Sequence, residues 1–322
     1  QAKSQLWKIV SELSRADKDG ETPNLQIALY EYGNDNLSAR TGHIRQVSPF
    51  TSNMDLISEK LFSLTTNGGN EYCGQVIKTS LDKLDWTNSD KGLRLIYIAG
   101  NEGFNQGPIL YSDACTAAQK RGITVNTIFC GEQSNGYNLG WKQAAEITGG
   151  MFASINQNEI TTYTSTPYDA QIQKLNSELN TTYIPYGDKG EANMQNVTIQ
   201  DSNAGHYAVE NVTDRVVFKS SKMYKNVDWD FVDAYEYDKK VVKDKSKIPA
   251  KYKGKSEKEI EAEVKKEKLR RDQIKAQIQD LSKKRKQHIV ENEVVTESSN
   301  LEKSMLKSIE DQAKKKGYKI KN

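Results

Sequence analysis

The chain has 322 residues, of which 36% are hydrophobic and 28% are charged, and its formal net charge is +3. This length suits one α/β domain with an appendage, or two modest domains. The small net charge gives no reason to expect a nucleic-acid partner. No apolar run approaches the roughly 20 residues of a membrane-spanning helix, so we expect no direct insertion into a membrane.

The first half of the chain alternates between strand and helix patterns. Apolar runs typical of strands occupy 24–33, 44–50, 93–100, 123–131 and 151–156, and helical patterns occupy 1–13, 55–64, 71–84, 112–120 and 141–147. Strands that alternate with helices of this length indicate a parallel sheet with helices on both faces. The sequence therefore predicts an α/β fold with a doubly wound, mostly parallel sheet over residues 1–160.

The second half of the chain is more polar, and we divide it into two regions. Residues 161–245 contain a helix over about 166–182, followed by short β-like runs and aromatic residues, and are expected to form a helix and irregular connector. Residues 246–322 are dense in Lys and Glu, and a capping box at 256–259 opens a long helix that precedes a second one at about 298–316. We expect these two helices to form a C-terminal α-helical hairpin, with a partner-binding coiled coil as the alternative.

The three cysteines, Cys73, Cys115 and Cys130, do not form a disulfide framework, and no Cys or His spacing matches a zinc site. We interpret them as small buried hydrophobic side chains, with one disulfide and one free thiol as the alternative. A hydrolase that uses Cys73 or nearby carboxylates is a further hypothesis, but no histidine is placed to activate the thiol. We therefore expect no enzymatic activity.

Oxygen-bearing side chains gather where predicted elements end at one edge of the sheet. Open parallel sheets bind ligands outside the carboxyl ends of their strands. The segments that end there are 32–36, 65–74 and 99–104, and their polar residues include Asn34, Asn70, Glu71, Asn101 and Glu102. Because hard cations prefer oxygen ligands, we predict a site for Mg²⁺, or for Ca²⁺ or Mn²⁺, with Glu71 and Asn101 as ligands and the other three as a partner-binding rim. The alternative is that Asn101 and Glu102 only shape the turn.

The order of elements over about 1–160 resembles that of a von Willebrand factor type A domain. The segments that resemble a bacterial extracytoplasmic branch of this family are ALYEYGN, GGNEYCG, YIAGNEGF, ITVNTIFCG and WKQAAEITGG, and SKIPAKYKGKSEKEIEAEV resembles that branch's C-terminal extension. The resemblance implies a metal-ion-dependent adhesion site built from three loops. It also implies a protein-binding module of the bacterial cell envelope or periplasm, made with an export signal that has been removed, whose protein partner the sequence does not identify.

The chain departs from the family's site in all three loops. The family's first loop is an Asp-x-Ser-x-Ser motif between the first strand and first helix; this chain begins in that helix, so we expect the motif to lie upstream and two neighbouring strands to lack a ladder partner. The resemblance places Glu71 near the usual Thr of the second loop and Asn101 at the usual Asp of the third. Glu71 would then restore the charge that Asn101 gives up. The alternative is a relic site without a cation, in an assembly protein whose C-terminal helices form the interaction surface.

Overall fold

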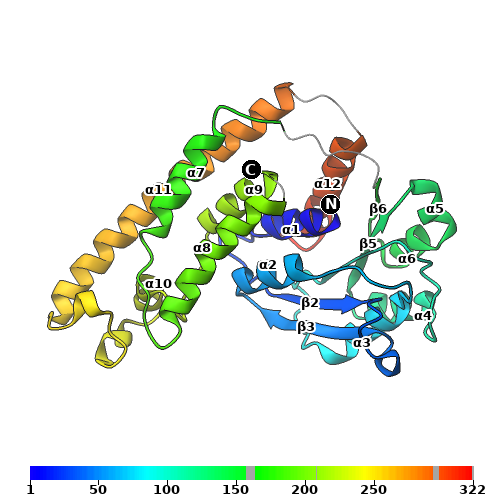
Figure 1. The fold of residues 1–322 in the computed structure, drawn as a ribbon, viewed down its shortest axis with the longest axis horizontal. Coiled ribbons are helices and arrows are strands. Elements are labelled where there is room, and N and C mark those ends of the chain that lie inside the picture. The colour runs from blue at the N-terminus through cyan, green and yellow to red at the C-terminus, as the bar shows by residue number, and fades with distance from the viewer. Residues whose placement is uncertain (157–163, 208, 293–296, 321–322) are drawn as a thin grey trace. The chain divides into compact units, whose positions relative to one another are not determined.

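The computed structural model describes residues 1–156, 164–207, 209–292 and 297–320, and it divides the chain into two compact units (Figure 1). Unit 1 consists of Gln1–Thr162 and Val295–Lys321, and unit 2 contains Tyr163–Val294. The end of the predicted sheet domain at residue 160 lies close to this division. The predicted boundary at residue 245 does not coincide with a division, because the end of the chain returns to unit 1.

The strands of unit 1 lie where the apolar runs predict them. They are β2 (Ile27–Tyr32), β3 (Ile44–Thr51), β4 (Leu95–Gly100), β5 (Thr124–Cys130) and β6 (Phe152–Ile155). β4, β5 and β6 are parallel neighbours in that order, and β2 pairs antiparallel with β3. The predicted α/β class with a mostly parallel sheet is therefore confirmed.

β2 and β4 share no ladder in the ranges that the structure describes, and each is paired along one side only. A side chain links them instead, since the Tyr32 hydroxyl donates to the carbonyl of Ala99 at 2.8 Å. Burial raises the pKa of Tyr32 well above its ordinary value, so the hydroxyl retains the proton that it donates. The expectation that two strands lack a ladder partner on one side is confirmed for these strands.

Seven helices belong to the described part of unit 1. They are α1 (Ala2–Leu13), α2 (Met54–Ser63), α3 (Cys73–Lys83), α4 (Tyr111–Lys120), α5 (Gln133–Asn138), α6 (Trp141–Thr148) and α12 (Glu297–Lys315). The sequence did not predict α5, because its six residues, QSNGYN, carry no apolar periodicity.

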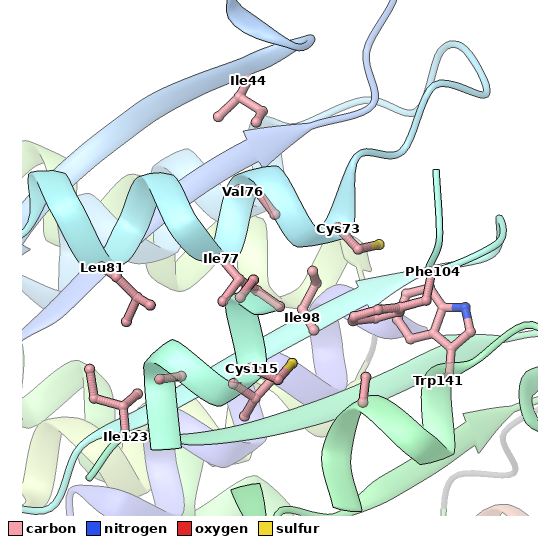
Figure 2. Packing of buried hydrophobic residues seen from close by; sticks show 14 of the residues in the cluster. Ile44, Cys73, Val76, Ile77, Leu81, Ile98, Phe104, Cys115, Ile123 and Trp141 are labelled. Carbon is pink, nitrogen blue, oxygen red and sulfur yellow. The ribbon is translucent and has the colours of Figure 1, made fainter. Parts of the chain in front are cut away.

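Helices cover both faces of the parallel sheet, as the sequence predicts. Successive side chains of β5 point to opposite faces. Val125 and Phe129 join a core with α3, α4 and α6, whereas Ile128 packs with α1 and α12. Figure 2 shows the first of these cores, where side chains of α3 face Ile98 of β4 and Phe104 lies against Trp141.

The last helix, α12, is part of this layered fold. Met305 and Ile309 are buried in a cluster with Ile9 of α1. Gln312 exchanges two hydrogen bonds with the fully buried Asn126 of β5, at 3.2 and 2.7 Å. The chain then turns and forms β7 (Lys319–Ile320), which pairs antiparallel with β1 (Ala16–Asp17).

The long helix α11 (Glu257–Asn292) instead packs within unit 2, against α7, α9 and α10. The predicted capping box opens it: Glu259 accepts the N–H of Ser256 at 2.8 Å, and its own N–H donates to the Ser256 hydroxyl at 3.3 Å. The structure therefore corrects the expected pairing of the two C-terminal helices. The apolar stripe of α11 is buried by helices of unit 2, and the stripe of α12 is buried by α1 and the sheet of unit 1.

Unit 2 is helical over most of the region expected to be an irregular connector. Its other helices are α7 (Asp169–Asn180), α8 (Gly190–Tyr207), α9 (Val209–Ser220) and α10 (Phe231–Tyr237), with 3₁₀ turns at Lys239–Lys243 and Ala250–Tyr252. The β-like runs NVTIQ and DRVVFK lie within α8 and α9. Val197 and Val216 are buried there, and this burial outweighs the slightly lower helix propensity of β-branched residues.

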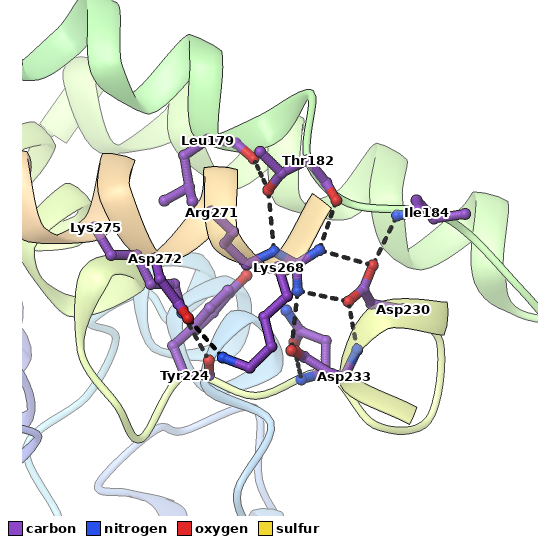
Figure 3. Close-up of polar contacts among 11 residues, drawn as sticks. Leu179, Thr182, Ile184, Tyr224, Asp230, Asp233, Lys268, Arg271, Asp272 and Lys275 are labelled. Atoms are coloured by element: carbon purple, nitrogen blue, oxygen red, sulfur yellow. Dashed lines mark hydrogen bonds and ion pairs between the residues drawn. The ribbon is translucent and has the colours of Figure 1, made fainter. Parts of the chain in front are cut away.

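Arg271, which interrupts the apolar stripe of α11, is buried at the centre of a charged network (Figure 3). Its guanidinium donates to Asp230 at 2.7 and 3.2 Å, to Asp233 at 2.9 Å, and to the carbonyl of Thr182 at 2.6 Å. Asp230 also accepts the N–H of Ile184 at 2.7 Å. The network therefore ties α11 to α10 and to the segment that follows α7.

A second buried network joins α7, α8 and α9. Asp201 of α8 accepts hydrogen bonds from Arg215 at 2.6 Å and from Lys219 at 2.7 Å. Lys219 also donates to Asn176 and Asn180, at 2.8 and 2.6 Å. Burial by itself would raise the pKa of Asp201, but Lys219 and Arg215 outweigh it and lower the pKa to about 2 from the ordinary 3.8.

We expect Asp201 to make the stability of unit 2 depend on pH in the acid range. Because the pKa is lower in the folded state, the stabilisation is complete above about pH 4 and is lost as the pH falls toward 2. The shift corresponds to about 2 kcal/mol. Denaturant unfolding of the native chain and of Asp201→Asn should therefore differ by at least this amount at pH 6, and the difference should shrink near pH 2.

The matched control is Asp188→Asn, which changes an exposed carboxylate in the same unit. Its free energy of unfolding should stay within about 0.5 kcal/mol of that of the native chain at both pH values. A stability difference for Asp201→Asn that does not change with pH would contradict the assignment.

Candidate functional site

The three predicted loops meet at the carboxyl ends of β2 and β4. The N–H of Asp35 donates to the carbonyl of Asn67 at 2.8 Å, which joins the first loop to the second. The N–H groups of Asn101 and Glu102 donate to Glu71 Oε2 at 3.1 and 3.3 Å, which joins the second loop to the third. Backbone and carboxylate hydrogen bonds thus connect 32–36, 65–74 and 99–104 into one polar edge of unit 1, which we call the loop face.

Glu71 is the centre of this arrangement. Burial raises the pKa of its carboxyl group, and the two N–H donors of Glu102 and Asn101 offset this only in part. The N–H of Glu71 itself donates to Gln106 Oε1 at 3.0 Å. Consecutive backbone N–H groups that point at one oxygen form a small anion-binding nest. Here the chain fills the nest with its own side chain, so Glu71 fastens the third loop to the second.

Gly100, the last residue of β4, allows the close approach of Glu71. A Cβ atom at this position would lie 2.2 Å from Glu71 Oε2 and 2.7 Å from the Tyr32 hydroxyl oxygen. Contacts this short would displace both side chains. The glycine is therefore needed for the carboxylate to reach the two N–H groups beyond it.

Two buried aromatic residues hold the third loop against the core of unit 1. The ring centroids of Phe104 and Trp141 are 4.6 Å apart in an edge-to-face arrangement, and both side chains are fully buried (Figure 2). Trp141 Nε1 donates to the carbonyl of Glu102 at 2.8 Å, and the N–H of Phe104 donates to the carbonyl of Leu139 at 2.9 Å. Sequence reasoning did not assign these roles, although an aromatic residue directly after AGNEG is a visible signal.

Three of the predicted site residues lie on the accessible loop face. Asn70 and Asn101 are exposed, and Glu102 is half-buried. Asn101 Nδ2 donates to Glu102 Oε1 at 3.1 Å, and Gln106 Nε2 donates to Glu102 Oε2 at 3.5 Å. The side chains of Asn101, Glu102 and Gln106 therefore form a connected polar rim beside Glu71, and Asn70 is exposed on the second loop.

Asn34, which was predicted to join the rim, is buried instead. Its Nδ2 donates to Glu31 Oε1 at 2.7 Å, and its Oδ1 accepts the N–H of Asn36 at 3.0 Å. Its polar atoms are thus used within the first loop. Asn34 shapes that turn and presents no group to a partner.

At the loop face, the two predicted cation ligands, Glu71 and Asn101, take part in hydrogen bonds within the protein. The described residues contain no group of three or more His, Cys, Asp or Glu side chains placed to hold a metal ion. Glu71 Oε2 already accepts two N–H groups, and Asn101 Nδ2 donates to Glu102 Oε1. The predicted role of Glu71 and Asn101 as ligands for Mg²⁺, Ca²⁺ or Mn²⁺ therefore stays a prediction.

None of the three cysteines, all of which lie in the described part of the chain, forms a disulfide. Cys73 is fully buried, and burial raises its pKa far above the ordinary value. Burial likewise raises the pKa of Cys115 to about 12 and that of Cys130 to about 11. Because the thiolate is the reactive form, this environment gives no support to Cys73 as a nucleophile.

Two exposed leucines adjoin the loop face. A Cβ atom at Gly103 of the third loop would lie 3.8 Å from Leu139 Cδ2, and one at Gly74 of the second loop would lie 3.1 Å from the backbone of Leu110. Leu139 is 37% exposed and accepts the N–H of Phe104 through its carbonyl, while Leu110 is 53% exposed and directly precedes α4. In the described part of unit 1, these two are the large hydrophobic side chains that remain exposed. The sequence could not assign them to the loop face, because that placement depends on how the loops fold together.

The arrangement of strands and loops can be compared with known proteins. No family model and no curated protein matches the chain. Solved structures that it resembles include the VWA domain of SpRpn10, with 14% identity and a TM-score of 0.35 over 49% of this chain and 77% of the other. Another is the conserved hypothetical protein BatB from Bacteroides thetaiotaomicron, with 15% identity and a TM-score of 0.33 over 62% of this chain and 88% of the other.

The chain's own topology defines the fold of unit 1. The parallel order β4-β5-β6, the antiparallel β2-β3 pair and the helices on both faces agree with the fold that the sequence resemblance implies. Unit 1 has a von Willebrand A-like fold.

Among the described residues, no helix combines the length and the apolar character needed to cross a membrane.

Proposed function

We propose that unit 1 is a protein-interaction module and that the loop face is its docking surface. The observation that carries this proposal is that Leu110 and Leu139, the exposed large hydrophobic residues in the described part of unit 1, adjoin the second and the third loop respectively. Protein interfaces combine apolar contacts with a polar rim, and exposed apolar patches mark interaction sites. Asn70, Asn101 and Glu102 supply the polar rim.

The loop face is preorganised for binding. Glu71 fastens the second loop to the third, and Trp141 and Phe104 hold the third loop against the core. A surface already ordered before binding loses less conformational freedom when a partner docks. In this proposal the Glu71 carboxylate supplies the link between loops, and docking needs no cation.

We further propose an extracytoplasmic location, in the bacterial cell envelope or periplasm. The support is the resemblance of segments such as YIAGNEGF and ITVNTIFCG to an extracytoplasmic branch of von Willebrand A proteins. Fractionation of source cells with an antibody against the chain is the direct measurement. Recovery in the cytoplasmic fraction alone would contradict this location.

Site-specific photo-crosslinking tests the docking surface. A photoreactive residue at position 110 or 139 of the full chain should form adducts of discrete mass in source cells, because a partner covers these positions. The control position is Ile199 of α8, which is 53% exposed and belongs to unit 2. Equal adduct patterns from all three positions would contradict the proposal. Adducts from 110 and 139 that disappear with Asn101→Arg would support it.

A further inference from the structure

A lysine-dense segment lies outside the loop face, in unit 2. Residues 239–258, KKVVKDKSKIPAKYKGKSEK, contain nine lysines against Asp244 and Glu257, a net charge of +7, and no arginine. The segment connects α10 to α11 and is drawn in yellow at the start of α11 in Figure 1. The chain as a whole carries only +3, so this segment is a local concentration of positive charge.

A small apolar core fixes the backbone of this segment and leaves its lysines outside. Val242 and Tyr252 are buried in a cluster with Phe231 of α10 and Ile260 of α11. All nine lysines are exposed: Lys239, Lys240, Lys243, Lys245, Lys247, Lys251, Lys253, Lys255 and Lys258. The inward positions are thus taken by apolar side chains, and the lysine side chains remain exposed.

Most of this charge is not neutralised within the protein. Lys239 pairs with Glu261 at 3.4 Å, Lys247 pairs with Asp244 at 3.5 Å, and Lys255 pairs with Glu263. The other six lysines of the segment have no acidic partner in the described part of the chain: Lys240, Lys243, Lys245, Lys251, Lys253 and Lys258. An external anionic surface would supply the missing counter-charge.

The side-chain chemistry favours one kind of anionic surface. Lysine presents a compact point charge, whereas the bidentate geometry that selects individual phosphates or base edges comes from arginine, which the segment lacks. Tyr237, at the end of α10, is 81% exposed and adjoins the lysines. Exposed tyrosine rings are typical of the headgroup level of a membrane. We propose that Tyr237 and the lysines of residues 239–258 dock on a surface of anionic lipid headgroups.

Vesicle co-sedimentation of the full chain tests this proposal. The native protein should bind phosphatidylcholine vesicles that contain 30% phosphatidylglycerol and should not bind pure phosphatidylcholine. Binding should be lost between 0.05 and 0.5 M salt, because the interaction is electrostatic (about a threefold drop in screening length). The variant Lys240→Gln, Lys243→Gln, Lys245→Gln and Lys253→Gln should bind at least about a hundredfold more weakly, since each lysine contributes roughly fivefold.

The matched control removes the same charge elsewhere. Lys83, Lys120, Lys174 and Lys222 are exposed and have no acidic partner among the pairs of the described residues, so their change to Gln should leave unit structure and vesicle binding nearly intact. Thermal unfolding confirms that both variants fold.

Equal loss of binding in the two variants would show a net-charge effect and overturn the proposal. Equal binding to neutral vesicles would overturn it too, as would tighter binding to a duplex DNA oligonucleotide than to the anionic vesicles. Photo-crosslinking from position 139 does not involve this segment, so the two proposals fail independently.

Discussion

Replacing Arg271 with alanine should lower the free energy of unfolding of unit 2 by about 3–5 kcal/mol. The change removes the cation from a buried network and leaves Asp230, which is fully buried, without its charged partner. The carbonyl of Thr182 also loses its donor. Denaturant unfolding followed by circular dichroism, with the midpoint and slope fitted together, measures the loss.

The control for this prediction is Arg270→Ala on the adjacent position of α11. Arg270 is exposed and pairs with Glu267 at 3.1 Å, an interaction of the kind that contributes less than about 1 kcal/mol. If the two variants lost equal stability, the buried network would not be the source of the Arg271 effect.

Replacing Trp141 with alanine should lower the free energy of unfolding of unit 1 by about 3–5 kcal/mol and release the third loop from the core. Trp141 is fully buried, packs against Phe104 and donates to the carbonyl of Glu102. Trp141→Phe keeps an aromatic ring in the core and should cost less, because it mainly removes the hydrogen bond, which contributes about 1 kcal/mol. Comparing Trp141→Ala with Trp141→Phe therefore separates the contribution of packing from that of the hydrogen bond to the third loop.

Leu139→Ala is the matched control, because Leu139 neighbours Trp141 in sequence but is partly exposed. Its effect on unfolding should stay within about 1 kcal/mol. A Trp141→Ala variant that unfolds like the native chain would contradict the placement of the third loop against this core.

The fold of unit 1 could be predicted because its local patterns agree with its tertiary structure. β4 and β5 are continuous apolar runs, and the stripes of α1 and α3 repeat at helical spacing. The return of α12 to the sheet could not be predicted, because it depends on a contact between Gln312 and Asn126, residues that are distant in sequence. A truncation after residue 245 therefore removes core residues from both units. Such a truncation cannot test whether the C-terminal helices alone form an interaction surface.

The helices of the predicted connector were missed for another reason. α8 and α9 bury charged side chains, Asp201 with Arg215 and Lys219, on the faces where an amphipathic pattern would show apolar residues. The stripe that normally reveals a helix is thus replaced by a polar network. Only the structure shows that these charges are paired with one another.

The location of the candidate site followed from the sequence, but its chemistry did not. Strand ends place oxygen-bearing residues at one edge, and Glu71 and Asn101 do lie there. The partners of Glu71 are backbone N–H groups, which every residue except proline carries and which no side-chain motif reveals. Asn34 was misplaced because an asparagine that shapes a turn and one that faces a partner look alike in sequence.

Amide hydrogen exchange of Asn101 and Glu102 tests most directly whether Glu71, without a cation, holds the loop face together. In the full chain with EDTA, both N–H groups should be protected, and Glu71→Ala should speed their exchange by about tenfold, the equivalent of one lost hydrogen bond. Glu71→Gln keeps an oxygen acceptor and should retain most of the protection. Added Mg²⁺ should change none of these rates. Exchange in Glu71→Ala as slow as in the native chain, or protection that appears only with Mg²⁺, would contradict the account.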